Sequence, residues 1–292
     1  MSQLDHLRAL HWSGTPVSDV WFGLMQLAAE TEQMTTLVSP ETERALRGVL
    51  ARTLGIAGTV AVVDLDNHNA SERALLRGLS AARKSDDSRL IAWLYGKLAH
   101  RRIYDFSGNR IANLLEALKY VQYADRYAGD NPVVLADLLN TKGEALAALG
   151  RESAIGDIHV AGTMMESAPE DITPEWLSHF NESRVHSMLG ACYLKLNKPK
   201  DARYELDIAL VGIGENHSHE VIVLADSARA YAQIGEPEQA RQFLTYALPV
   251  AQRSRSALRT TRIRAARHEL HPLAHEPFII ALDERLHAAS LS

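Results

Sequence analysis

The chain has 292 residues, enough for two ordinary domains or for one elongated repeat domain. Hydrophobic residues make up 46% of it, and the net charge of -5 argues against a general nucleic-acid-binding protein. Cys192 is the only cysteine, which excludes an internal disulfide and a cysteine-based zinc site. No secretion leader and no apolar run of the roughly 18 residues that span a membrane is recognised. We therefore expect a cytoplasmic protein without membrane contact.

Every longer segment of the chain shows helical periodicity. Proline directly after a capping residue indicates helix starts at Ser39-Pro40, Asn131-Pro132 and Thr173-Pro174, because the first helical position does not use its N–H. The β-branched run at residues 59–63 lies in an otherwise helical pattern, so we interpret it as buried helix. In residues 109–124 the apolar side chains recur three and four apart, which is typical of one buried helix face. The sequence predicts an all-α protein.

Small residues recur with the spacing of tetratricopeptide repeats, in which they let the two helices of a pair approach closely. The set Gly190, Tyr193, Ala202, Leu206 and Ala209 recurs 38 residues later as Ala228, Tyr231, Ala240, Leu244 and Ala247. Earlier units are indicated by Gly58, Gly96 and Gly143. About five such pairs predict a right-handed superhelical solenoid. We expect an N-terminal helical cap over residues 1–44, the repeat array over 45–252 and C-terminal capping helices over 253–292.

Several of these segments resemble the repeat region of actinobacterial transcriptional regulators. The segments are Thr53-Leu-Gly-Ile-Ala-Gly58, Trp93-Leu-Tyr-Gly-Lys-Leu-Ala99, Trp176 before residues 190–196, and the closing stretches 254–270 and 277–286. The resemblance covers roughly residues 45–288 and implies an array that senses a peptide or small molecule. In that family a helix-turn-helix of the phage-repressor type usually precedes the array. Residues 1–45 show none, so direct DNA binding by this chain is not expected, while a homodimer through the C-terminal cap fits such arrays.

Catalytic and cofactor motifs are not recognised in the sequence. No glycine-rich phosphate loop follows a strand, no serine lies in a nucleophile elbow, and no metalloprotease motif occurs. Two histidine groups are candidate metal sites. His268, His271 and His275 could share a helix face but are interrupted by Pro272, and His217 with His219 are more typical of a polar inter-helix loop. We therefore expect no metal, no cofactor and no enzymatic activity.

Arginines concentrate between residues 253 and 267. Their positions do not form a single-sided stripe on a helix, as a phosphate-binding surface would. We interpret them as a solvated helix whose arginines pair with neighbouring carboxylates. An acidic partner or nucleic acid is the alternative.

The first helices of the pairs form the concave side of such a superhelix, where ligands of this architecture generally bind. The repeat spacing places these residues in the groove: Trp93, Lys97, His100, Asp137, Asn140, Glu144, Arg184, Ser187 and Arg229. It places Arg52 and Thr59 there as well. Among them, Asn140 is suited to pair with a peptide amide, Arg184 and Arg229 to hold a carboxylate, and Trp93 to cover an apolar side chain. The alternative is an ordinary exposed polar surface.

The sequence thus predicts a regulatory module that binds a peptide or small ligand in its concave groove and is linked to transcriptional regulation. A protein-interaction adaptor without a small ligand is the alternative, and an enzyme on an α-solenoid scaffold is a remote one.

Overall fold

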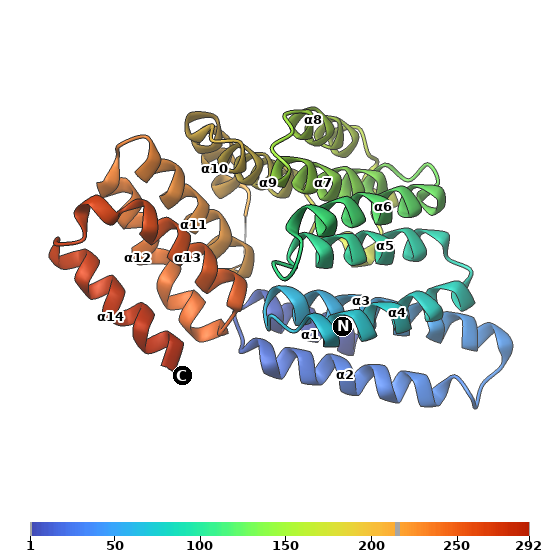
Figure 1. Ribbon diagram of the computed structural model, residues 1–292. Coiled ribbons are helices and arrows are strands. Elements are labelled where there is room, and N and C mark those ends of the chain that lie inside the picture. The colour runs from blue at the N-terminus through green and yellow to red at the C-terminus, as the bar shows by residue number, and fades with distance from the viewer. Residues whose placement is uncertain (1, 214–216, 292) are drawn as a thin grey trace.

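The computed structural model describes residues 2–213 and 217–291, and this part of the chain contains fourteen α-helices, three short 3-10 helices and no strand (Figure 1). The α-helices are α1 (Gln3–Trp12), α2 (Val17–Met34), α3 (Pro40–Val63), α4 (His68–Ser85), α5 (Ser88–Ile103), α6 (Arg110–Ala128), α7 (Pro132–Ala148), α8 (Ser153–Glu166), α9 (Glu182–Lys195), α10 (Pro199–Val211), α11 (His217–Gln233), α12 (Pro237–Ser254), α13 (Ala257–Glu269) and α14 (Pro277–Leu291). The 3-10 helices are η1 (Glu170–Ile172), η2 (Glu175–Leu177) and η3 (His271–Leu273). The predicted all-α class is confirmed.

Consecutive helices pack in pairs, namely α3 with α4, α5 with α6, α7 with α8, α9 with α10 and α11 with α12. The first helix of each pair also packs against the first helix of the next pair, and α11 packs against α13. The first helices therefore form a continuous inner layer, and the second helices form the outer layer. This arrangement confirms the predicted solenoid of helix pairs.

Glycines mark the closest approach within the pairs, as the repeat pattern predicts. A Cβ atom on Gly190 would lie 2.4 Å from Cγ of Leu206, and one on Gly58 would lie 2.6 Å from Cγ of Leu75. On Gly143 it would lie 2.6 Å from Ile158. Each of these contacts joins the inner helix of a pair to its own outer helix. A larger residue at these positions would force the pair apart.

Two of the three predicted helix starts are confirmed. Ser39 and Asn131 accept hydrogen bonds from backbone N–H groups three residues on, and α3 and α7 follow them directly. The run at residues 59–63 is part of α3, as expected. The start at Pro174 is wrong, because only the three-residue η2 follows it. The next α-helix begins after Asn181, whose side chain caps it.

Helix α3 is a core helix. Its composition and length also fit a membrane-crossing helix, with a window of mean hydropathy 1.5, but 56% of that window is buried inside the protein. Leu50, Leu54 and Ala57 on this helix are at most 2% exposed. The predicted domain boundary at residue 44 falls within α3 and the one at residue 252 within α12, so the division into caps and array stays a prediction.

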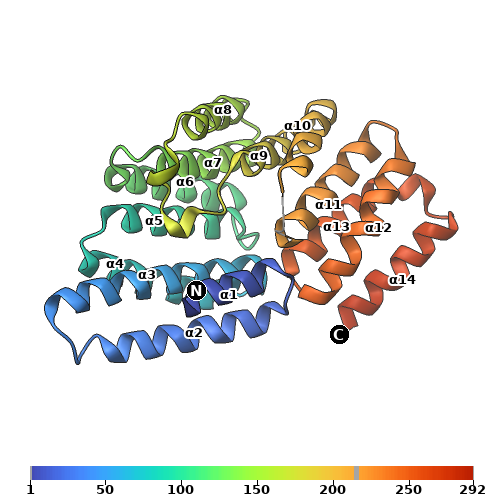
Figure 2. The same cartoon turned by 180° about the vertical axis from the view of Figure 1, so that it is seen from behind.

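The two ends of the solenoid touch each other next to Asp64, which directly follows α3 (Figures 1 and 2). Its carboxylate accepts a hydrogen bond from the Ser256 hydroxyl at 2.6 Å and lies 3.0 Å from Nε2 of His11 and 3.6 Å from Nη2 of Arg259. Asp64 is 4% and Arg259 2% exposed. We call these four residues the terminal clasp. Since the clasp joins α1 and α3 to the start of α13, the inner layer curves back on itself.

Candidate functional site

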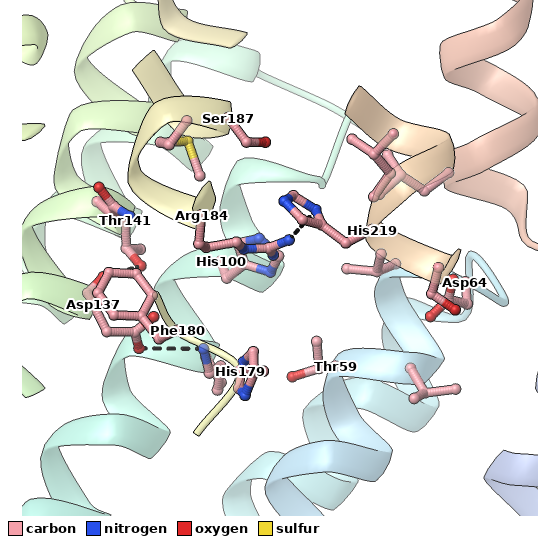
Figure 3. Close-up of a pocket in the computed structure, with 18 of the residues that line it drawn as sticks. Thr59, Asp64, His100, Asp137, Thr141, His179, Phe180, Arg184, Ser187 and His219 are labelled. Carbon is pink, nitrogen blue, oxygen red and sulfur yellow. Dashed lines mark hydrogen bonds and ion pairs between the residues drawn. The ribbon is translucent and has the colours of Figure 1, made fainter. Parts of the chain in front are cut away.

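The inner helices surround a cavity of about 200 Å³. Each inner helix from α3 to α13 contributes lining residues, and α1 and the segment around η2 contribute others (Figure 3). On α9 the lining positions are Arg184, Ser187, Met188 and Ala191, which follow the i, i+3, i+4, i+7 pattern. That spacing places them on one face of the helix. The same spacing recurs on the other inner helices, so the helical period directs side chains from each repeat into one cavity.

Eight of the nine predicted groove residues line this cavity: Trp93, Lys97, His100, Asp137, Asn140, Glu144, Arg184 and Ser187. Arg229 is not among the lining residues, because it lies too far along α11 and its Nε donates to Glu269 at 3.1 Å. Arg52 also lies outside the cavity and pairs with Glu175 at 2.9 Å. Thr59 does line it. The structure thus brings most of the predicted set together, and the ligand-binding role of these residues stays a prediction.

A buried charge network lies at Glu144, which is 2% exposed. Its Oε1 atom accepts hydrogen bonds from Lys195 at 2.9 Å and from the Tyr104 hydroxyl at 3.0 Å. Burial acts to raise the pKa of Glu144, but Lys195 and His100 hold it at about 2, so the carboxylate is ionised. Burial lowers the pKa of His100 to about 4, so this imidazole is neutral near pH 7. Among the described residues no hydrogen-bond donor reaches Oε2 of Glu144.

One turn before Glu144, the side chain of Asn140 is buried in the same cavity wall. Asn140 is 3% exposed, and neither the nitrogen nor the oxygen of its carboxamide has a hydrogen-bond partner in residues 2–213 and 217–291. The neighbouring Asp137 is paired with Lys97 at 3.3 Å, and the Lys97 ammonium lies 5.6 Å from the ring centre of Trp93. Leaving a buried polar group unpaired costs about 1–3 kcal/mol. Asn140 therefore marks a place in the cavity wall where the carboxamide would gain its missing partners by turning toward a bound molecule.

Arg184 and His219 reach toward each other from the first turns of α9 and α11 (Figure 3). Nη1 of Arg184 lies 2.6 Å from Nδ1 of His219. A guanidinium can only donate, so Nδ1 is the acceptor and the imidazole proton is on Nε2. Burial, together with the charge of Arg184, holds the pKa of His219 well below its usual range. Burial does the same for His179, and it also lowers the pKa of Arg184 itself.

Some cavity residues contradict the sequence interpretation. His219 does not lie in a polar loop, because it is in the first turn of α11 and is 8% exposed; the side chain of His217 lies outside the described residues. Arg259 and Arg262 are not on a solvated helix face. They line the cavity, with Arg259 2% exposed and Arg262 paired to Asp226 at 2.9 Å. His219, Arg259 and Arg262 follow the same three-and-four spacing as the other lining positions on α11 and α13, and this spacing in the sequence could have predicted that they line the cavity.

Shifted pKa values gather around this cavity, which is a property of catalytic sites and of buried ion networks alike. The nearby Cys192 is fully buried, and burial raises its pKa to about 12, so it is a thiol rather than a reactive thiolate. The part of the chain that the structure describes holds no group of three or more side chains suited to bind a metal. His268, His271 and His275 are all exposed. What the arrangement offers is hydrogen bonding and charge to a bound molecule.

No family model matches the chain, and no curated protein matches it. Among solved structures it is similar to a Signal Transduction ATPase with Numerous Domains protein with a tetratricopeptide repeat sensor from Pyrococcus horikoshii, with a TM-score of 0.48 and 16% sequence identity. The match covers 94% of this chain and 42% of that one, so this chain spans less than half the length of that protein. A likeness of this strength says nothing about function here, and the relation to actinobacterial regulators stays a prediction.

Proposed function

We propose that this chain is a regulatory module that senses a small ligand in the cavity of its solenoid. The observation that carries the proposal is the buried carboxamide of Asn140, which has no partner among the described residues. On the same or the neighbouring inner helix, Oε2 of Glu144 and Nδ1 of His100 are buried and unpaired within the described chain as well. Such groups destabilise an empty protein, and a ligand with complementary donors and acceptors removes that cost when the side chains turn toward it.

The size of the cavity limits what it admits. Its volume of about 200 Å³ is below the roughly 300–1,000 Å³ typical of sites for drug-sized ligands. This favours a small molecule, or one end of a peptide, over a folded partner segment. The predicted link to transcription rests on the sequence resemblance alone and stays a prediction.

The terminal clasp gives the module a means to report occupancy. His11, Asp64 and Arg259 hold the two ends of the solenoid together, and all three also line the cavity. A ligand that binds the clasped arrangement more tightly than an opened one shifts the population toward it. Stacked helix pairs can follow such a shift by small adjustments at successive interfaces. The change in shape is then available to a partner.

Native mass spectrometry of the protein from its own host tests the proposal. The variant is Asn140→Leu, which replaces the unpaired carboxamide by an apolar side chain of similar volume. The matched control is Asn69→Leu, at an exposed position of α4. We expect a co-purified small molecule on the wild type and on the control, and its loss from Asn140→Leu. We also expect the ligand-free Asn140→Leu protein to be more stable than ligand-free wild type by about 1–3 kcal/mol, because no unpaired polar group remains buried there.

Two outcomes contradict the proposal. If the small molecule stays bound to Asn140→Leu at the wild-type level, the cavity wall at Asn140 is not its site. If wild type carries no small molecule but a stoichiometric protein partner, the chain is an adaptor of the kind that the sequence left as the alternative.

A further inference from the structure

Charge pairing in the cavity singles out Arg184. The other lysine and arginine side chains that line the cavity each lie within ion-pair distance of a carboxylate. The pairs are Arg8 with Asp5 at 3.7 Å, Lys97 with Asp137 at 3.3 Å, Arg259 with Asp64 at 3.6 Å and Arg262 with Asp226 at 2.9 Å. The lining carboxylate that remains, Glu144, is paired with Lys195 at 2.9 Å. Within residues 2–213 and 217–291, Arg184 has no carboxylate partner.

In the described part of the chain no carboxylate lies within ion-pair distance of Arg184, and the charges of Asp137 and Glu144 act on it only from farther away. Its side chain donates to the imidazole of His219, and burial keeps that ring and the ring of His179 in the neutral form near pH 7. One hydrogen bond uses one of the five N–H donors of a guanidinium, and no other nitrogen of Arg184 is among the buried unpaired atoms. The remaining donors are therefore accessible from the cavity. Among the described residues, Arg184 is thus the lining cation without an ion-pair partner, and it faces the space where a ligand would lie.

A single fixed charge selects a single opposite charge. A guanidinium matches the two oxygens of a carboxylate in a planar, bidentate arrangement. A second negative charge on the ligand would find no free cation, because the remaining lining cations are paired and Glu144 is ionised nearby. Trp93, Trp176 and Phe180 line the same cavity and provide an apolar wall for the rest of a ligand.

We propose that the ligand of this cavity is a small monocarboxylate whose carboxylate group binds the side chain of Arg184 while its apolar body lies against the aromatic wall. The inference rests on the proposed function, since it names the class of the ligand that the module senses.

Acids paired with their amides, which have nearly the same shape, test whether the ligand must carry a negative charge. The probes are formate, benzoate and phenylacetate, each with its amide (formamide, benzamide and phenylacetamide), and sulfate as a dianion. Titrations followed through the Nε–H resonances of the arginines in the full chain report binding at millimolar affinity, and the Arg184→Gln variant assigns the resonance of Arg184. The matched control is Arg229→Gln, an inner-helix arginine that does not line the cavity.

We expect at least one carboxylate to shift the Arg184 resonance at saturation and to bind roughly 10- to 100-fold more tightly than its amide, the range for a charged hydrogen bond. Arg184→Gln should remove this difference and Arg229→Gln should keep it. Amides that bind as tightly as the acids, sulfate that binds more tightly than every carboxylate, or carboxylates that leave the Arg184 resonance unshifted would overturn the inference. The acid–amide comparison on the wild type is decisive even where Arg184→Gln fails to fold. If the amides bind and their binding depends on Asn140, the inference that the ligand is a carboxylate is wrong, while the proposal that the cavity binds a small ligand is supported.

Discussion

Removal of the Asp64 carboxylate should open the terminal clasp. In Asp64→Ala, Arg259 loses its only carboxylate within ion-pair distance in the described structure, and Ser256 loses an acceptor at 2.6 Å. Arg259 is 2% exposed, so its charge stays buried without compensation. Breaking a buried ion pair from one side costs about 3–5 kcal/mol. We expect the free energy of unfolding to fall by that amount.

Urea unfolding followed by circular dichroism measures this loss, and small-angle X-ray scattering shows whether the ends of the solenoid separate. The double variant Asp64→Ala/Arg259→Met should lose less than the sum of the single variants, because it leaves no buried charge. Asp125→Ala is the control: Asp125 is exposed on α6, and its loss should change the stability by no more than about 0.5 kcal/mol. A cost below about 1 kcal/mol for Asp64→Ala, or strict additivity in the double variant, would refute the description of the clasp as a coupled buried pair.

Two further predictions concern pH and the inner glycines. Burial lowers the pKa of His100 from 6.5 to about 4 in the folded protein. Between pH 4 and pH 6.5 the unfolded chain therefore binds more protons than the folded protein does. The free energy of unfolding should fall by about 3 kcal/mol from pH 6.5 to pH 4 on this account, and urea unfolding of His100→Gln should show a shallower pH dependence than wild type. An equal dependence would contradict the neutral burial of His100. In thermal melts Gly190→Ala should destabilise, because its Cβ would lie 2.4 Å from Leu206, at an overpacking cost of about 1–3 kcal/mol that exceeds a helix-propensity gain of up to about 1 kcal/mol. Gly156→Ala, where no atom of the described residues lies within 4 Å of the added one, should stabilise by that gain, and an equal response of the two variants would contradict the close approach.

Much of the fold could be predicted from the sequence because its signals are local. The 38-residue recurrence that includes Gly190 reflects one helix pair, and the contact that it predicts lies inside that pair. The positions that line the cavity, such as Lys97 and Asn140, follow from helical period within one repeat. The expected place of Arg229 in the cavity wall is wrong for a related reason. The part of α11 that lines the cavity begins in its first turn, at His219. The repeat consensus instead selects Arg229, which lies too far toward the C-terminal end of the helix.

What the sequence could not predict depends on distances that accumulate over the whole array. The Ser256–Asp64 hydrogen bond joins residues 192 positions apart, and it forms only because the successive helix-pair interfaces together bring the start of α13 back to the end of α3. Whether two side chains meet at that range is set by the pitch of the solenoid, which no single repeat encodes. For the same reason Arg259 and Arg262 look like solvent-facing residues in the sequence but are packed against α3 and α11.

The overlap between clasp and cavity is what makes sensing physically reasonable in this chain. An open groove can bind a ligand without any change in shape, because no contact elsewhere depends on its walls. Here Asp64 and Arg259 both line the cavity and close the solenoid, so a ligand that contacts that wall alters the free energy of closure directly. A ligand shifts an equilibrium only by its differential affinity for the two states. A carboxylate held at Arg184, across inner helices from the clasp, would stabilise the arrangement in which α9 and α11 stay together, and α11 in turn contacts α1 and α13. In Asp64→Ala this coupling requires a weaker ligand affinity and, at the same ligand concentration, a correspondingly smaller ligand-induced stabilisation than in wild type.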